Sequence, residues 1–157
     1  MRKQIISQGI QGDSLIDQEW LDVERLARVE LTSEDPAHPF ESALHFDTGS
    51  AWRASSPGEQ TIRLLFHEPL RIKHIRLEFH EEKYPRTQQF VLRWSPGKGQ
   101  SYQEIVRQQY NFSPPETFSE VENYAVDLAG VTALELSIVP DISGSDVRAS
   151  LALLQLA

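Results

Sequence analysis

From about residue 60 onward, apolar and polar residues alternate along the chain with a period of two. Successive side chains of a β-strand point to opposite faces, so each alternating run predicts a strand with one buried side and one wetter side. The alternating runs span residues 61–66, 72–80, 88–94 and 134–138. Further strands are predicted at 103–111, 122–128 and 149–156, and the last of these is apolar on both faces, which indicates a central or covered strand.

Turn-forming residues separate the predicted strands at intervals of about 8–12 residues, a spacing typical of a β-sandwich or barrel. The clearest of these turns are Pro57-Gly58, Glu68-Pro69, Pro96-Gly97, Pro114-Pro115 and Ala129-Gly130. No glycine-rich phosphate loop follows a strand, and no long helical pattern alternates with the strands. A parallel α/β fold is therefore not expected.

Residues 1–26 form a less regular N-terminal extension. Their apolar positions recur at near-helical spacing and predict one short helix, with Asp13 or Ser14 in position to cap it. These positions are Leu15, Ile16, Trp20, Val23 and Leu26. An alternating stretch at 28–32 predicts the first strand. With 157 residues, the chain is expected to form a single domain whose core spans residues 27–156.

Composition excludes several classes of function. The formal net charge of −8 opposes non-specific binding to nucleic-acid phosphates and to anionic lipid, so neither partner is expected. The chain has no cysteine, which excludes a disulfide, a thiolate nucleophile and a cysteine-based zinc site. The N-terminus lacks the apolar stretch of a signal peptide, and no apolar run reaches the ~20 residues needed to cross a bilayer, so a cytoplasmic location is predicted.

An ordered series of short motifs gives the chain a family likeness. A strand at Val29–Ser33 precedes a proline-containing loop, which is followed by Ala43, Asp47 and Trp52. Two alternating strands come next, then Arg86 before a further strand that ends in Trp94-Ser95. In this order the chain resembles the discoidin domain, also called the coagulation-factor C-type or galactose-binding-like domain. The resemblance covers roughly residues 27–156 and implies an all-β, eight-stranded jelly-roll β-sandwich, here with a short N-terminal helix.

The resemblance also implies a candidate metal site. Many members of this family bind calcium with the carbonyls of one loop, its Asp and a Glu of the last strand. Asp47 matches the loop residue and is the candidate metal ligand, but the last strand, 151–155, has no Glu. A hard cation prefers about six to eight oxygen ligands, several of them charged. The alternative is that Asp47, Thr48 and Ser50 form an Asx- or Ser/Thr-turn that satisfies its own backbone, with Trp52 beneath it in the core.

Members of the family that bind sugar use the loops at one end of the sandwich. Such binding requires an aromatic face for the C–H groups of the sugar, and polar or charged side chains for its hydroxyls. By position, the candidate ligand-binding residues are His45, Arg53, His80, Tyr84, Arg86 and Arg148. The stretch 80–86 combines an aromatic ring with several cationic side chains, although a solvated hairpin has the same composition. Arg148 has the alternative of forming an ion pair within the fold.

No motif of catalysis is present. The five histidines lack a metal-binding spacing, and there is no Gly-x-Ser-x-Gly motif and no paired acid motif in a loop. We therefore predict a non-catalytic binding module that takes carbohydrate or a small polar ligand at its rim loops. Two alternatives stay open: an intracellular protein–protein interaction module, and a dimerisation domain without a small-molecule ligand. The rim-site hypothesis requires the loops at 45–53, 80–86 and 141–148 to converge.

Overall fold

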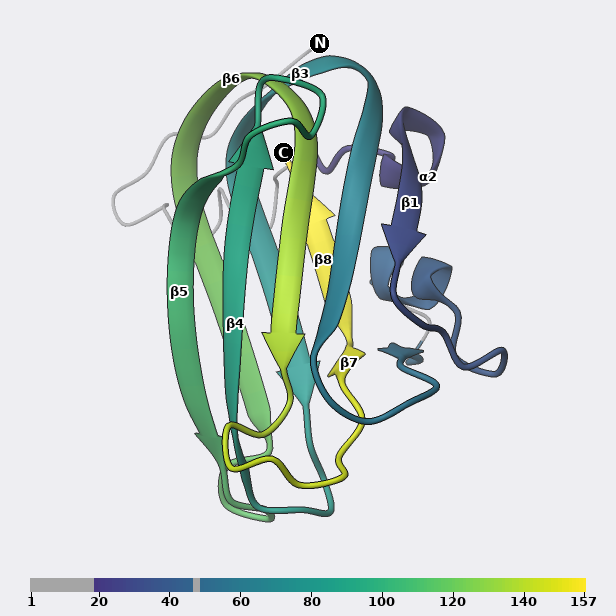
Figure 1. Ribbon diagram of the computed structural model, residues 1–157, viewed down its shortest axis with the longest axis vertical. Coiled ribbons are helices and arrows are strands. Elements are labelled where there is room, and N and C mark those ends of the chain that lie inside the picture. The colour runs from purple at the N-terminus through teal and green to yellow at the C-terminus, as the bar shows by residue number, and fades with distance from the viewer. Residues whose placement is uncertain (1–18, 47–48) are drawn as a thin grey trace, which may run out of the picture.

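Two long antiparallel strands, β3 (Gln60–His80) and β6 (Ser119–Val139), run through both layers of a β-sandwich (Figure 1). The computed structural model describes residues 19–46 and 49–157. The first half of β3 pairs with the second half of β6 in one layer, and the remaining halves pair in the other layer. Both strands therefore bend over the same edge of the sandwich.

The bends lie where turns are predicted from the sequence. The register between β3 and β6 is irregular from Leu65 to His74, and this stretch contains Pro69. On β6 the bend contains Gly130, whose φ of 69° lies in the left-handed region that glycine adopts without strain. The turns predicted at Glu68-Pro69 and Ala129-Gly130 are thus bends within continuous strands, because a proline and a glycine let each strand pass from one layer to the other.

Shorter strands complete the two layers. One layer has the order β1–β3–β6–β4–β5, and β8 pairs with the second half of β3 in the other layer. Their bounds are β1 (Ala27–Leu31), β4 (Arg86–Ser95), β5 (Gln103–Phe112) and β8 (Leu153–Leu156). Because β3 and β6 serve both layers, the described residues supply five strand segments to one layer and three to the other. This arrangement confirms the predicted eight-stranded sandwich.

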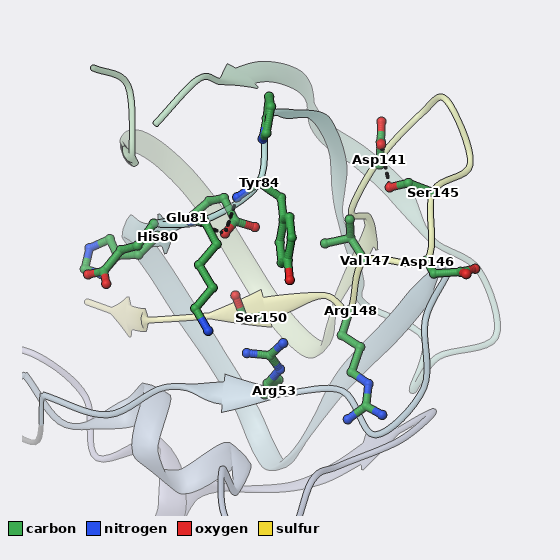
Figure 2. Close-up of a pocket in the computed structure, with 13 residues that line it drawn as sticks. Arg53, His80, Glu81, Tyr84, Asp141, Ser145, Asp146, Val147, Arg148 and Ser150 are labelled. Carbon is green, nitrogen blue, oxygen red and sulfur yellow. Dashed lines mark hydrogen bonds between the residues drawn. The ribbon is translucent and has the colours of Figure 1, made fainter. Parts of the chain in front are cut away.

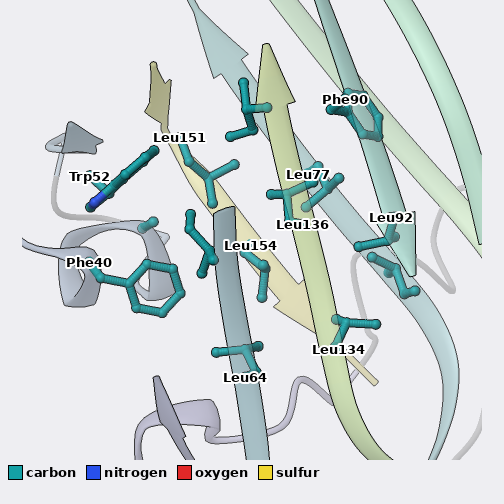
Figure 3. Packing of buried hydrophobic residues seen from close by; sticks show 14 of the residues in the cluster. Phe40, Trp52, Leu64, Leu77, Phe90, Leu92, Leu134, Leu136, Leu151 and Leu154 are labelled. Atoms are coloured by element: carbon teal, nitrogen blue, oxygen red, sulfur yellow. The ribbon is translucent and has the colours of Figure 1, made fainter. Parts of the chain in front are cut away.

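The core fills the space between the layers with the apolar rows of the alternating runs (Figure 3). Most of the predicted inward residues are at most 2% exposed: Ile62, Leu64, Ile75, Leu77, Phe79, Phe90, Leu92, Leu134, Leu136 and Ile138. The two exceptions stand at the ends of their rows: Phe66 is 9% exposed, and Trp94 is only partly buried against the core. Phe79 and Phe90 stack across the two layers with their ring centroids 5.2 Å apart. Each such side chain contributes about 1.5–3 kcal/mol on full burial, so this row accounts for much of the stability of the fold.

The C-terminal strand is covered, as its two apolar faces predict. All four residues of β8 are buried, and the N–H of Leu21 donates to the carbonyl oxygen of Leu156 at 2.8 Å. Phe40, from the 3-10 helix η1 (Phe40–Leu44), and Trp52 lie beside Leu151 and Leu154 in Figure 3. Trp52 is fully buried, as predicted, and its indole N–H donates to the carbonyl oxygen of Ser33 at 3.2 Å.

The N-terminal helix is shorter than the sequence pattern predicts. It consists of α2 (Val23–Leu26), one turn that ends because Ala27 is extended and begins β1. Asp22 stands at its N-cap without a side-chain capping bond. The earlier part of the predicted helix, with Asp13 and Ser14, lies outside the described residues. In the described ranges, no helix has the length and apolar character needed to cross a membrane.

Candidate functional site

Three segments that are distant in sequence meet towards the end of the sandwich opposite the C-terminus. Two of them lie at the bottom of Figure 1, and the third lies higher, at the side. They are the β3–β4 loop, the segment between β6 and β7 (Ser150–Leu151), and β2 (Trp52–Arg53). Together they enclose a cavity of about 670 Å³, which we call the rim pocket. Its lining residues are Arg53, His80, Glu81, Glu82, Lys83, Tyr84, Pro85, Asp141, Ser145, Asp146, Val147, Arg148 and Ser150.

The short ladder between β2 and β7 turns two polar side chains towards the rim pocket. Trp52 pairs with Leu151 and Arg53 pairs with Ser150. Side chains alternate across a strand, so burial of Trp52 and Leu151 in the core leaves Arg53 and Ser150 on the outer side. Arg148 lies two residues before Ser150 on the same chain, and the buried Ala149 separates them.

Glu81 fixes the shape of the β3–β4 loop. One of its carboxylate oxygens accepts hydrogen bonds from the backbone N–H groups of Lys83 at 2.9 Å and Tyr84 at 3.2 Å. The other accepts a bond from Nε of Arg86 at 2.7 Å. Burial opposes ionisation of Glu81, but these hydrogen bonds outweigh it and lower the pKa of the carboxyl group. The ionised Glu81 thereby holds the backbone from which Tyr84 projects.

Arg86 has a structural role, which corrects the prediction that it contacts a ligand. Its side chain is 1% exposed and points into the sandwich. One guanidinium nitrogen donates to the carbonyl oxygen of Pro140 at 2.7 Å and to Oε1 of Gln88 at 3.1 Å. The guanidinium also lies 4.6 Å from the ring centroid of Phe112. Arg86 therefore ties the β3–β4 loop to the end of β6 and has no surface to offer a ligand.

Asp141 organises the opposite wall of the pocket (Figure 2). Its carboxylate accepts hydrogen bonds from the hydroxyl of Ser145 at 2.6 Å, and from the hydroxyl and backbone N–H of Ser143 at 2.7 and 3.1 Å. The hydrogen bond from Ser145 is the largest cause of a lowered pKa for Asp141, about 2. The N–H of Ile142 donates to the carbonyl oxygen of Thr87, which joins this segment to β4.

Tyr84 and the two arginines Arg53 and Arg148 supply the exposed surface of the rim pocket. Tyr84 is 57% exposed, and in Figure 2 its ring extends from the β3–β4 loop towards Ser150. Both arginines are exposed. The structure thus brings together four of the predicted residues, Arg53, His80, Tyr84 and Arg148. Ser150 was not predicted, because its place beside Arg53 depends on the pairing of β2 with β7.

A second cavity of about 440 Å³, which we call the adjacent pocket, shares three lining residues with the rim pocket. The shared residues are Arg53, His80 and Ser150. His45 lines the adjacent pocket and not the rim pocket, and its Nε2 contacts a carboxylate oxygen of Glu24. Phe46, which the sequence pattern did not single out, also lines the adjacent pocket and is 71% exposed.

The predicted metal ligand, Asp47, lies outside the described residues. Among residues 19–46 and 49–157, no group of three or more His, Asp or Glu side chains is arranged to hold a metal ion. Calcium binding by Asp47 stays a prediction.

No family model and no curated protein matches the sequence. Solved structures are nevertheless similar. The family 32 carbohydrate-binding module of C. perfringens NanJ, in complex with galactose, has a TM-score of 0.63 at 10% identity, over 87% of this chain and 96% of that one. The family 32 module of AlyQ, in complex with 4,5-unsaturated mannuronic acid, has a TM-score of 0.64 at 12% identity, over 89% and 98% of the two chains.

A further family 32 module from Clostridium perfringens, in complex with GalNAc-beta-1,3-galactose, has a TM-score of 0.62 at 15% identity, over 88% of this chain and 99% of that one. At these identities the likeness establishes the fold. The chain has the galactose-binding-like, discoidin-type β-sandwich fold of family 32 carbohydrate-binding modules, as the sequence resemblance implied.

Proposed function

We propose that this protein is a non-catalytic carbohydrate-binding module and that the rim pocket is its binding site. The observation that carries the proposal is the convergence of the β3–β4 loop, the β6–β7 segment and β2 on one cavity. Its volume of about 670 Å³ lies within the range of small-molecule sites, about 300–1,000 Å³.

The surface of the rim pocket has the chemistry that sugar recognition requires. The exposed ring of Tyr84 offers an apolar face to the C–H groups of a pyranose. Arg53, Arg148 and Ser150 offer donors, and Ser150 also an acceptor, to the ring hydroxyls. The bound galactose, disaccharide and mannuronic acid in the similar structures support this class of ligand.

The carboxylates of the rim pocket support a binding role rather than a catalytic one. Glu81 and Asp141 are saturated by hydrogen bonds that hold the two loops in place. Glu82 and Asp146 are exposed and unshielded from water. The hydrogen bonds to Glu81 and Asp141 lower the pKa of these two carboxyl groups, which is the opposite of the raised pKa that a general acid requires. The cytoplasmic location predicted from the N-terminal sequence stays a prediction.

A glycan array followed by titration of the hits tests the proposal. Saturable binding of a glycan is expected, and Tyr84→Ala should weaken it at least about tenfold through loss of the stacking face. Phe118→Ala is the matched control, because Phe118 is a comparably exposed aromatic, 48%, that does not line the rim pocket. A flat array, or equal losses in the two variants, would contradict the proposal. A flat array with a specific co-purifying protein would favour the interaction-module alternative.

A further inference from the structure

We infer that the ligand of the rim pocket is an acidic sugar, one that carries a carboxylate or a sulfate ester, and that Arg53 and Arg148 bind this anionic group. The inference rests on the proposed function and narrows it to a class of carbohydrate.

The distribution of paired and unpaired arginines carries the inference. The described residues include ten arginines, and eight of them form an ion pair within 4.0 Å. For the remaining two, Arg53 and Arg148, no side-chain hydrogen bond or ion pair with a described residue is present. Both of these arginines line the rim pocket. Lys83, which also lines it, likewise has a side chain without such a partner.

The acidic residues of the rim pocket do not neutralise these cations. Glu81 forms an ion pair with Arg86, and Asp141 accepts hydrogen bonds from two serines, so neither carboxylate forms an ion pair with Arg53 or Arg148. Glu82 also lines the pocket, and its exposed carboxylate lies beyond ion-pair distance of both arginines. Asp146 directs its carboxylate away from Arg53 and Arg148 in Figure 2. Asp35 pairs with His38 and is influenced by Arg148 only at a range longer than an ion pair.

The overall charge of −8 does not argue against a local anion site. Charges separated by more than about 8–10 Å are largely screened at physiological ionic strength, so the groups nearest the ligand decide its binding. Two arginines are suited to this role, because the planar guanidinium fork matches a carboxylate or sulfate in a bidentate arrangement. The pocket then pairs an anion-binding side, formed by Arg53 and Arg148, with a stacking side, formed by Tyr84.

Calorimetric titration of the full chain with matched sugars tests the inference. The probes are oligomers of galacturonate, mannuronate and glucuronate, each beside its methyl ester, together with 6-sulfated and unmodified galactose oligomers. We expect at least one acidic form to bind at least about tenfold more tightly than its uncharged counterpart, as charge-assisted hydrogen bonds provide. The probe class, carboxylated or sulfated, with the larger gain in affinity over its uncharged counterpart then identifies the anionic group.

Variants assign this selectivity to the two arginines. Arg53→Gln and Arg148→Gln should each weaken binding of the acid at least about fivefold more than binding of its ester, so that the ratio of the two affinities falls towards one. Arg107→Gln is the control: Arg107 is exposed, lies on β5 away from the pocket, and its loss changes the net charge equally.

The outcomes separate the inference from the proposed function. Equal binding of acids and their neutral counterparts overturns the acidic-sugar inference and leaves carbohydrate binding in place. Acid selectivity that survives both arginine substitutions also overturns it, because the selectivity then comes from other groups. Failure of every charged and neutral sugar to bind overturns the proposed function itself.

Discussion

Arg86 and Arg148 lie at the same end of the sandwich but have opposite surroundings. Arg86 is almost fully buried, donates to Glu81, Gln88 and the carbonyl oxygen of Pro140, and lies over the ring of Phe112. Arg148 is exposed and has no side-chain partner within ion-pair distance among the described residues. The first arginine stabilises the loops, and the second has its hydrogen-bonding capacity still available.

This difference divides the rim pocket into a scaffold and a contact surface. The scaffold consists of buried and half-buried polar groups whose hydrogen bonds fix the loop backbones, chiefly Glu81, Arg86 and Asp141. The contact surface consists of exposed groups carried by those backbones, chiefly Arg53, Tyr84 and Arg148. A pocket of this kind binds with little cost of ordering, because its loops are already held in one conformation. Substitutions in the scaffold should therefore affect stability first, and substitutions in the contact surface should affect binding alone.

The largest effect is expected from Arg86→Ala. Removal of this guanidinium leaves Glu81 and the carbonyl oxygen of Pro140 without their partner in a buried environment, which should cost about 3–5 kcal/mol of unfolding free energy. Urea titration monitored by tryptophan fluorescence measures the loss. Arg148→Ala is the matched control and should change stability by less than about 0.5 kcal/mol, since its side chain is exposed. Similar stabilities of the two variants would contradict the division of the rim pocket into a scaffold and a contact surface.

The next effect concerns Glu120, a buried carboxyl group beneath the scaffold. It is 1% exposed, and Nε2 of Gln88, itself a partner of Arg86, donates to it at 3.4 Å. Burial, followed by the proximity of Glu122, raises the pKa of Glu120 to about 8. The folded chain therefore holds a proton that the unfolded chain releases near pH 4.5, so stability falls as the pH rises from about 4.5 to about 8.

Glu120→Gln should remove this dependence, because the amide cannot ionise. We expect the variant to be more stable than the parent chain by roughly 2 kcal/mol at pH 8.5, and to differ little at pH 5. Urea titrations at the two pH values give the comparison. The lowered pKa values of Glu81 and Asp141 are common to the parent chain and the variant, so their effects cancel in the difference between the two. If the stability difference between Glu120→Gln and the parent chain is the same at pH 5 and pH 8.5, then Glu120 is already ionised at pH 5 in the folded chain.

The division between scaffold and contact surface could be predicted only in part from the sequence. The alternation of apolar and polar residues identified the inner faces of the strands, because successive side chains point to opposite faces and only one face packs against the core. The same rule applies to Arg86: extending the inward series of Phe90 and Gln88 back by two residues places Arg86 inside as well. Arg86 is nevertheless predicted at the rim because it belongs to the stretch 80–86, which groups an aromatic ring and cationic side chains around a proline turn.

Other features of the rim pocket had no local signal. Arg53 reaches the pocket because β2 pairs with β7, and this pairing joins segments far apart in the sequence. Ser150 was missed for the same reason. No pattern in the chain distinguishes an arginine with a partner from one without, since the partner is set by the tertiary structure. The unpaired state of Arg53 and Arg148, on which the acidic-sugar inference depends, is therefore a finding of the structure.

A smaller effect is expected from Asp141→Ala, which removes the acceptor for the two serine hydroxyls of the β6–β7 segment. Because the segment is still tied to β4 by the bond from Ile142 to Thr87, a loss of about 1 kcal/mol is expected at neutral pH. The pKa of Asp141 is lowered to about 2, so its contribution is present above the ordinary value near 3.8 and is lost as the pH falls through about 2. Urea titrations measure the free energy of unfolding of the parent chain and the variant at pH 7 and pH 2. The difference between the two chains should be present at pH 7 and nearly vanish at pH 2.

Phe46 tests how far the contact surface extends, and its effect should be the smallest. It lines the adjacent pocket, which shares Arg53, His80 and Ser150 with the rim pocket. A longer sugar chain bound at Tyr84 can therefore continue past Arg53 to the exposed ring of Phe46, whereas a monosaccharide in the rim pocket does not reach it. We expect Phe46→Ala to weaken binding of a hexasaccharide by about threefold and to leave monosaccharide binding and thermal stability unchanged, because one exposed aromatic contact contributes less than about 1 kcal/mol. Equal losses for the short and long ligands would place Phe46 outside the contact surface, because its effect would then not depend on the length of the sugar.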